Sequence, residues 1–257
     1  MTAPVTQLRP EAGPATDHPT VAPLTNVAAT LGAVRAAQAR THGLPGLVVL
    51  HGPSGWGKTT AACYTAVQCR AYYVQAQTLW SRGDFIEACC RELGLSVKGT
   101  AAAKADAIAE QLALSRRPLL IDEAHVLCAR ATGAGALKDI HDATDGTILL
   151  IGEEVLPQSM TRYERLHGRV LEWVSAAPCS VADAQALTRI YAPEVSVARD
   201  LLERLVQLAK GSVRRVAVNL DRIRTEAATM GWTDVDLARW GERALYTGEP
   251  PARRVPR

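Results

Sequence analysis

Short apolar runs alternate with longer stretches of helical spacing between residues 46 and 174. The apolar runs are strand-sized and occupy residues 46–51, 71–75, 118–121, 147–151 and 170–174. The stretches between them predict helices, because their apolar residues recur three or four positions apart. Strands that are separated by helices favour parallel βαβ units. The pattern therefore predicts an αβα sandwich around a five-stranded parallel sheet.

The pattern changes after Pro178, where the strand-sized runs stop. Helical spacing follows at residues 181–191, 197–209, 213–229 and 234–243. Ser180 and Asp183 resemble a capping box at the start of the first of these helices. We therefore predict an αβα domain over residues 25–177 and a helical subdomain over residues 178–245.

The two ends of the chain lack hydrophobic periodicity. Residues 1–24 are rich in Pro, Ala and Thr, which favours a flexible tail. Residues 246–257 are predicted as a disordered tail for the same reason. The first helix is expected at about 26–40, with Asn26 as its N-cap.

Composition narrows the class of protein. The chain is 47% hydrophobic and 21% charged, as is typical of soluble globular proteins, and no segment approaches the roughly 20 apolar residues of a membrane span. The six cysteines form no C-x-x-C pair, so we expect reduced, buried thiols in a cytoplasmic protein, with no membrane partner. A formal net charge of +3 permits a nucleic-acid partner without requiring one.

Residues 52–59 match the phosphate-loop pattern G-x-x-x-x-G-K-[ST] in full, between a predicted strand and a predicted helix. The glycines let backbone N–H groups turn towards phosphates, and the helix adds its positive N-terminal end. Lys58 is expected to reach the β and γ phosphates of ATP, and Thr59 to help hold Mg²⁺. A chance glycine-rich turn is the alternative. The predicted ATP-binding residues here are Gly52, Pro53, Ser54, Gly55, Trp56, Gly57, Lys58, Thr59 and Thr60.

A second motif ends the third predicted strand. Residues 117–123 read Arg-Pro-Leu-Leu-Ile-Asp-Glu, an apolar strand followed by two acids. We expect Asp122 to share the Mg²⁺ ion with Thr59, and Glu123 to polarise the attacking water. A solvated acidic turn is the alternative. His125 completes an Asp-Glu-Ala-His tetrapeptide, which also marks one class of helicases, but those need a second ATPase-like domain.

This order of motifs resembles the AAA+ ATPases: phosphate loop, acidic strand, one further strand, then a helical lid. The resemblance implies that Gly211-Ser212-Val213-Arg214-Arg215 is the sensor-2 segment, in which Arg214 touches the γ-phosphate and Arg215 is the neighbour to test. It also implies an arginine finger before the fifth strand that reaches the nucleotide of an adjacent subunit. Arg169 matches that position best and Arg165 second, and the active unit would then be an oligomer.

One position departs from the AAA+ pattern. Where the family presents Asn, Ser or Thr as sensor 1, this chain has Gly152-Glu153-Glu154, so either Glu153 or a nearby polar residue takes the position. An acid near the γ-phosphate would repel it unless it is neutralised or turned away. Hydrolysis is therefore expected to be slow, and a nucleotide-binding scaffold that barely hydrolyses ATP is an alternative.

Within AAA+, residues 151–158 and 165–169 resemble the transposition ATPases, the Mu B family of transposable phages and the target-selector ATPases of transposons. The resemblance covers about residues 25–242. It implies ATP-bound subunits that form a helical filament on double-stranded DNA with little sequence preference and direct a transposase to target DNA. The transposase would stimulate hydrolysis. Such binding rests on phosphate contacts, for which the candidates are Arg82, Lys98, Lys104, Arg130 and Lys138.

Two other functions stay open at this point. One is a replication initiator or helicase-loader ATPase. The other is a nucleotide switch of the secretion or signalling type, which acts on a protein partner.

Overall fold

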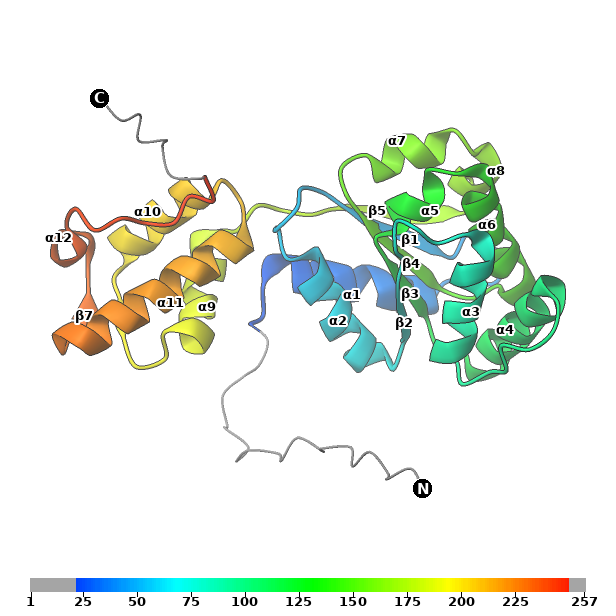
Figure 1. Cartoon of the computed structure of the whole chain (residues 1–257), viewed down its shortest axis with the longest axis horizontal. Coiled ribbons are helices and arrows are strands. Elements are labelled where there is room, and N and C mark those ends of the chain that lie inside the picture. Colours follow the sequence, from blue (N-terminus) through cyan, green and yellow to red (C-terminus); the bar gives the residue numbers. More distant parts are fainter. Residues whose placement is uncertain (1–21, 250–257) are drawn as a thin grey trace, which may run out of the picture.

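The computed structural model describes residues 22–249, which form a sheet-based domain and a helical lid (Figure 1). The sheet has five strands, all parallel, in the order β2-β3-β4-β1-β5. They are β1 (Leu47–His51), β2 (Tyr72–Gln75), β3 (Leu119–Asp122), β4 (Ile148–Gly152) and β5 (Val170–Ser175). The predicted five-stranded parallel sheet is confirmed.

Helices cover both faces of the sheet (Figure 1). Helices α1 (Thr25–Gln38) and α2 (Lys58–Cys69) pack on one face. The other face carries α3 (Arg82–Glu92), α4 (Ala101–Ser115), α5 (Ala124–Cys128), α6 (Ala131–Thr144), α7 (Leu156–Thr161) and α8 (Glu164–His167). A hydrophobic core lies on each face of the sheet. Each strand contributes side chains to both cores, because successive side chains point to opposite faces. In β1, Val48 and Leu50 belong to the α1–α2 core, and Leu47 and Val49 to the opposite one.

The lid follows β5 and contains three long helices, α9 (Val181–Tyr191), α10 (Arg199–Ala209) and α11 (Val213–Met230). It also contains a small parallel pair of strands that the sequence did not predict, β6 (Ser196–Val197) and β7 (Asp234–Val235). The predicted helix at 234–243 is wrong for most of its length, since only α12 (Leu237–Trp240) is helical there. Asp236 starts this turn by accepting a hydrogen bond from the N–H of Arg239 at 2.7 Å.

Helix α1 joins the lid to the sheet. The Asn26 side-chain amide donates to the carbonyl oxygens of Trp56 and Ala177, at 2.8 and 2.9 Å, and its oxygen accepts from the N–H of Ala177. Asn26 is buried in the first turn of the helix, so it is not the N-cap, which is Leu24. The carboxylate of Asp183, which caps α9 with Ser180, also accepts from the N–H of Thr25 at 2.8 Å. The phosphate loop, the end of β5 and the lid thus meet at one helix end.

Most of both predicted tails, residues 1–21 and 250–257, lies outside the described residues. At the edges of the described range, Ala22 and Leu24 are buried, and Tyr246 exchanges backbone hydrogen bonds with the side chain of Asn219. The prediction of buried thiols is wrong for Cys63, which is exposed on α2. Among residues 22–249, no helix combines the length and the apolarity that crossing a bilayer requires.

Candidate nucleotide-binding site

The phosphate-loop residues connect β1 to α2 at the carboxyl edge of the sheet. Gly55 and Gly57 have φ angles of 82° and 85°, in the left-handed region that L side chains rarely adopt. A Cβ atom on Gly55 would lie 2.7 Å from the Oγ atom of Ser212 in the lid. Glycine at position 55 is therefore required both by the turn and by the contact with the lid.

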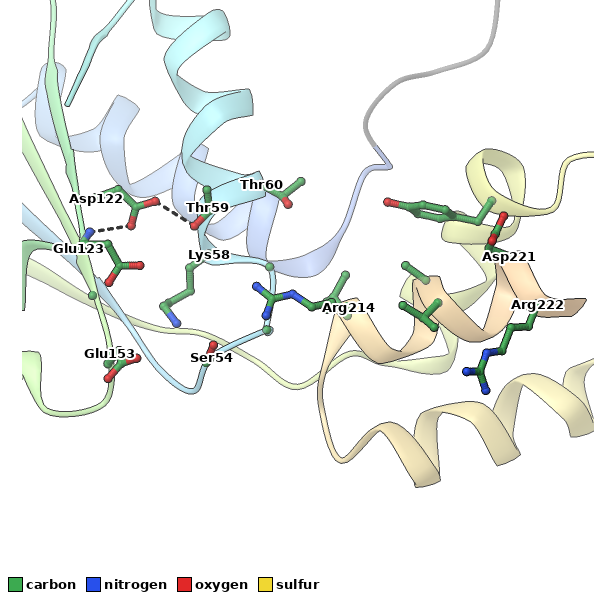
Figure 2. Close-up of a pocket in the computed structure, with 17 residues that line it drawn as sticks. Ser54, Lys58, Thr59, Thr60, Asp122, Glu123, Glu153, Arg214, Asp221 and Arg222 are labelled. Carbon is green, nitrogen blue, oxygen red and sulfur yellow. Dashed lines mark hydrogen bonds between the residues drawn. The ribbon is translucent and has the colours of Figure 1, made fainter. Parts of the chain in front are cut away.

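A cavity of about 650 Å³ lies between this loop and helix α11 (Figure 2). Its volume is in the range of small-molecule sites. The residues from the sheet domain are Ser54, Gly55, Gly57, Lys58, Thr59, Thr60, Asp122, Glu123, Gly152 and Glu153, and those from the lid are Tyr191, Val213, Arg214, Ala217, Val218, Asp221 and Arg222.

Three of the predicted loop residues do not line the cavity. Gly52 and Pro53 contribute carbonyl oxygens that accept hydrogen bonds from the Lys58 ammonium, at 2.7 and 2.8 Å. Trp56 packs against the lid instead, so closely that a Cβ on Gly211 would lie 2.6 Å from the Trp56 ring. The loop therefore presents one face to the cavity and another to the lid.

Lys58 places a positive charge in the cavity (Figure 2). Burial lowers the pKa of its ammonium group, and the carboxylates of Glu123 and Asp122 oppose that change. Glu153 acts in the same direction from the end of β4. Lys58 thus lies among these three acids, with Arg214 lining the same cavity from the lid, an arrangement suited to a ligand that brings its own negative charge and a metal ion.

Asp122 is almost fully buried, with 2% of its surface exposed. Its Oδ2 atom accepts hydrogen bonds from the hydroxyls of Thr59, at 2.9 Å, and Tyr73, at 2.8 Å. Its Oδ1 atom accepts from the N–H of Glu123 at 2.8 Å. A hydroxyl and a carboxylate side by side fit Mg²⁺, which takes oxygen ligands and commonly uses one or two carboxylates together with phosphate oxygens.

Glu123 has a φ angle of 56°, an uncommon left-handed conformation for a residue other than glycine. It lies between β3 and α5, and its side chain reaches the cavity. The carboxylate lies 3.4 Å from the Nδ1 atom of His125. A backbone held in this conformation at the end of β3 directs a carboxylate beside Lys58, where a water molecule could be polarised.

The first turn of α11 docks on the phosphate loop. The N–H of Arg214 and the hydroxyl of Ser212 both donate to the carbonyl oxygen of Gly55, at 3.2 and 3.4 Å. The Arg214 side chain lines the cavity and extends towards the loop (Figure 2), whereas Arg215 donates to the carbonyl of Ala209 and does not line it. The geometry therefore favours Arg214 over Arg215 for contact with a phosphate.

The two finger candidates differ in their contacts. Arg169 precedes β5, at the edge of the sheet opposite the phosphate loop, and its Nη2 atom donates to the Asp142 carboxylate at 2.7 Å. This guanidinium holds the pKa of Asp142 well below its ordinary value. Arg165 and Arg162 are exposed, and neither forms an ion pair within residues 22–249. An exposed arginine without an ion pair is better placed to reach a neighbouring subunit, so the geometry favours Arg165 over Arg169 as the arginine finger. The finger assignment stays a prediction.

The five predicted DNA contacts differ in how their side chains are engaged. Lys104 pairs with Glu87 at 2.7 Å, and Lys138 pairs with Asp139 and Asp142 at 3.1 Å. Arg130 donates to the carbonyl of Trp80 at 3.2 Å. Arg82 and Lys98 are exposed and form no ion pair within the described residues. Of the five, these two have the cationic groups most accessible to a phosphate backbone.

Sequence reasoning missed several residues of the site. Asp221 and Arg222 lie seven and eight positions after Arg214, so helical spacing from Arg214 would have placed them on the same face. Tyr191 comes from the end of α9, and nothing in the local sequence links it to the phosphate loop. Tyr73 lies on a neighbouring strand, in a segment that reads as ordinary core.

A family model described as an AAA domain matches residues 41–160, just under half of the chain. That range runs from before β1 into α7 and includes the phosphate loop and both acids of β3. No curated protein sequence matches the chain at a significant level.

Many solved structures are similar to this chain. The Aeropyrum pernix ORC1 protein, in complex with DNA, has a TM-score of 0.59 and 16% identity over 83% of this chain and 62% of its own. Cdc6p from Pyrobaculum aerophilum has a TM-score of 0.58 and 17% identity, over 87% of this chain and 66% of its own. The Thermotoga maritima RuvB Holliday junction branch migration motor has a TM-score of 0.55 and 19% identity, over 83% of this chain and 66% of its own. The chain thus spans less than two thirds of these proteins, and at such identities the likeness shows the fold.

These comparisons support the predicted resemblance to AAA+ proteins. The narrower resemblance to transposition ATPases stays a proposal. An AAA domain with this fold implies nucleotide binding together with a divalent metal ion. The strand order, the phosphate loop and the helical lid agree with that assignment. The predicted fold is therefore confirmed: the chain has the AAA+ P-loop fold, a five-stranded parallel αβα sandwich followed by a helical lid.

Proposed function

We propose that the chain binds ATP and Mg²⁺ in the cavity between the phosphate loop and α11 and hydrolyses the ATP slowly. One observation carries this proposal: Lys58, the Thr59–Asp122 pair, Glu123 and Arg214 all reach one cavity of about 650 Å³. These are the residue types that phosphoryl transfer needs for charge stabilisation and for orienting water.

Each side chain has a distinct role in this proposal. Lys58 exchanges its bonds with the Gly52 and Pro53 carbonyls for bonds with phosphate oxygens. Thr59 and Asp122 hold Mg²⁺, which neutralises phosphate charge when it is bound. Glu123 orients the attacking water, and Arg214 contacts the γ-phosphate from the lid. Glu153 lies across the cavity from Arg214 and keeps turnover low by repelling the γ-phosphate.

Hydrogen bonds couple the phosphate loop to the lid, so nucleotide binding at the loop can change the position of the lid. Ser212 and Arg214 bond the Gly55 carbonyl, and Asn26 ties Trp56 to the end of β5. A change at the loop therefore reaches the lid through direct bonds. With an arginine of the α7–α8 segment acting on a neighbouring subunit, the working form is an oligomer.

We further propose that this oligomer acts on double-stranded DNA. Support comes from similar solved proteins, which include ORC1 in complex with DNA and Drosophila ORC bound to DNA. The similarity to these structures favours a function of the replication-initiator or helicase-loader type. The second candidate function is to direct a transposase to target DNA. It rests on the sequence of residues 151–169, where Arg162 and Arg165 are exposed. A switch that acts only on a protein partner is the outcome if no DNA is bound.

Binding to labelled duplexes by fluorescence anisotropy tests the proposed action on DNA. Random-sequence duplexes of about 30 and 90 base pairs are compared with ATP and Mg²⁺, with ADP, and without nucleotide, over a salt series. Salt-sensitive binding that requires ATP supports action on DNA, because phosphate contacts release counterions. Cooperative binding that strengthens with duplex length favours the transposition task, and binding without this length dependence favours the initiator task. Absence of binding in every state would refute a direct role on DNA.

A further inference from the structure

Tyr73 makes a contact that no motif predicts. Its hydroxyl donates to the Oδ2 atom of Asp122 at 2.8 Å, the same oxygen that accepts from Thr59 at 2.9 Å. Tyr73 lies on β2, where its register partner on β3 is Leu120, two residues before Asp122. Its side chain therefore crosses diagonally to the neighbouring strand, a reach that aromatic residues can make.

The hydrogen bonds of Asp122 can be counted. A carboxylate offers about four lone-pair positions. Three are taken by the protein: Oδ1 accepts from the N–H of Glu123, and Oδ2 accepts from Thr59 and Tyr73. The donors come from three different elements, and the carboxylate is 2% exposed. Its orientation is thus fixed from three sides, with one acceptor position left.

Thr59 has only one hydroxyl hydrogen, and it is donated to Asp122. The lone pairs of the Thr59 oxygen therefore stay available for a metal ion. This arrangement depends on Oδ2 staying in place. Without Tyr73 the carboxylate would keep two hydrogen bonds, from Thr59 and from the Glu123 N–H, against a χ2 torsion that is broad. Tyr73 supplies the second donor to Oδ2 and further limits this rotation.

We propose that Tyr73 is a positioning residue for Mg²⁺, acting through Asp122. This inference rests on the proposed function, because it assumes that Thr59 and Asp122 hold the ion. Residues that orient metal ligands from behind commonly change metal affinity by about 10- to 100-fold when they are altered. Tyr73 is therefore part of the metal site without touching the ion.

The neighbouring Tyr72 provides a matched control. It lies on the same strand but on the opposite face, where its side chain is buried and its hydroxyl accepts from Gln111 at 3.2 Å. Tyr72→Phe removes a phenol hydroxyl from β2 and leaves Asp122 untouched. Tyr73→Phe removes the hydroxyl that reaches Asp122 and keeps the ring. The two variants separate metal positioning from a general effect on the strand.

The experiment measures binding of a fluorescent ATP analogue to the full chain while MgCl₂ is titrated, and again in EDTA. We expect the Mg²⁺ concentration for half-maximal binding to rise about 10-fold in Tyr73→Phe and to stay unchanged in Tyr72→Phe. The affinity for the ATP analogue in EDTA should be equal in the wild type and the two variants, because Lys58 and the phosphate loop are intact. Titration with MnCl₂, followed by electron paramagnetic resonance of the free ion, should give the same ranking.

Two results would overturn the inference alone: an unchanged Mg²⁺ midpoint in Tyr73→Phe, or an equal loss of affinity with and without metal. Thermal unfolding of each variant identifies a loss that comes from damage to the fold. A wild-type chain that binds no ATP would refute the proposed function, and this inference with it. The two failures are therefore distinguishable.

Discussion

Lys58 and Glu123 show how single residues set the chemistry of the cavity. Lys58 is held by the Gly52 and Pro53 carbonyls, so its ammonium group already lies inside the loop that would surround phosphates. Glu123 is held by an uncommon backbone conformation with φ of 56°, beside the buried Asp122. Both side chains are positioned by their own backbone segments, which limits the rearrangement that catalysis would require.

Glu123→Gln tests the catalytic carboxylate. The amide cannot accept a proton from water, so we expect the hydrolysis rate to fall by about 100-fold or more while ATP still binds. A phosphate-release assay at saturating ATP measures the rate, and nucleotide binding is measured in parallel. Glu154→Gln, one residue after the cavity-lining Glu153, serves as a control for the loss of a nearby acid. Unchanged turnover in Glu123→Gln would remove this residue from the role.

At the scale of elements, the first turn of α11 provides a natural comparison between adjacent arginines. Arg214 faces the cavity, and Arg215 bonds the carbonyl of Ala209. Arg214→Ala should weaken ATP binding by about 10-fold or more, because a charged hydrogen bond to the γ-phosphate is lost, and should weaken ADP binding less. Arg215→Ala should leave both affinities near wild type. Equal effects of the two changes on ATP would contradict the assignment of the helix face.

The contact between α6 and the start of β5 predicts a pH dependence. Arg169 lowers the folded-state pKa of Asp142, so this pair contributes stability that is present above the unfolded pKa of about 3.9 and is lost as pH falls towards the folded value. Asp142→Asn should therefore reduce the thermal midpoint more at pH 7 than at pH 3. Thermal unfolding of both proteins at the two pH values measures this, and an equal reduction would contradict it.

Elements differ in how well the sequence predicts them. The phosphate loop and the acids of β3 are local motifs, and parallel strands place both at the same edge of the sheet. Strands β6 and β7 have two residues each, too few to show a period, and the helical pattern around them hid the strands. The contact of Tyr73 with Asp122 joins adjacent strands diagonally, and strand order cannot be read from periodicity.

At the scale of the whole molecule, the exposed arginines of the α7–α8 segment predict an assembly. Arg165 is free of ion pairs within residues 22–249, whereas Arg169 is engaged by Asp142. Arg165→Ala should leave ATP binding by single subunits intact and lower hydrolysis in the assembled state by about 1,000-fold. Arg169→Ala should mainly lower stability. Assembled-state hydrolysis that is lost only in Arg169→Ala would reinstate Arg169 as the finger.

The whole-molecule arrangement was predictable in outline: an αβα domain followed by a helical lid. The closeness of the lid to the phosphate loop was not, because it depends on small contacts made by glycine, serine and asparagine. Gly55 admits Ser212 only because it has no side chain, and Asn26 bonds two segments that lie far apart in the sequence. Such residues carry no periodic signal, so their role emerges only once the chain is folded.

Isothermal titration of the full chain with ATP in the presence of Mg²⁺ measures whether the cavity between the phosphate loop and α11 binds the nucleotide. We expect one site per chain, loss of most of the affinity in Lys58→Ala, and unchanged binding in Lys210→Ala, an exposed lysine of the lid outside the cavity. Absence of ATP binding by the wild-type chain, or equal binding by wild type and Lys58→Ala, would contradict this expectation.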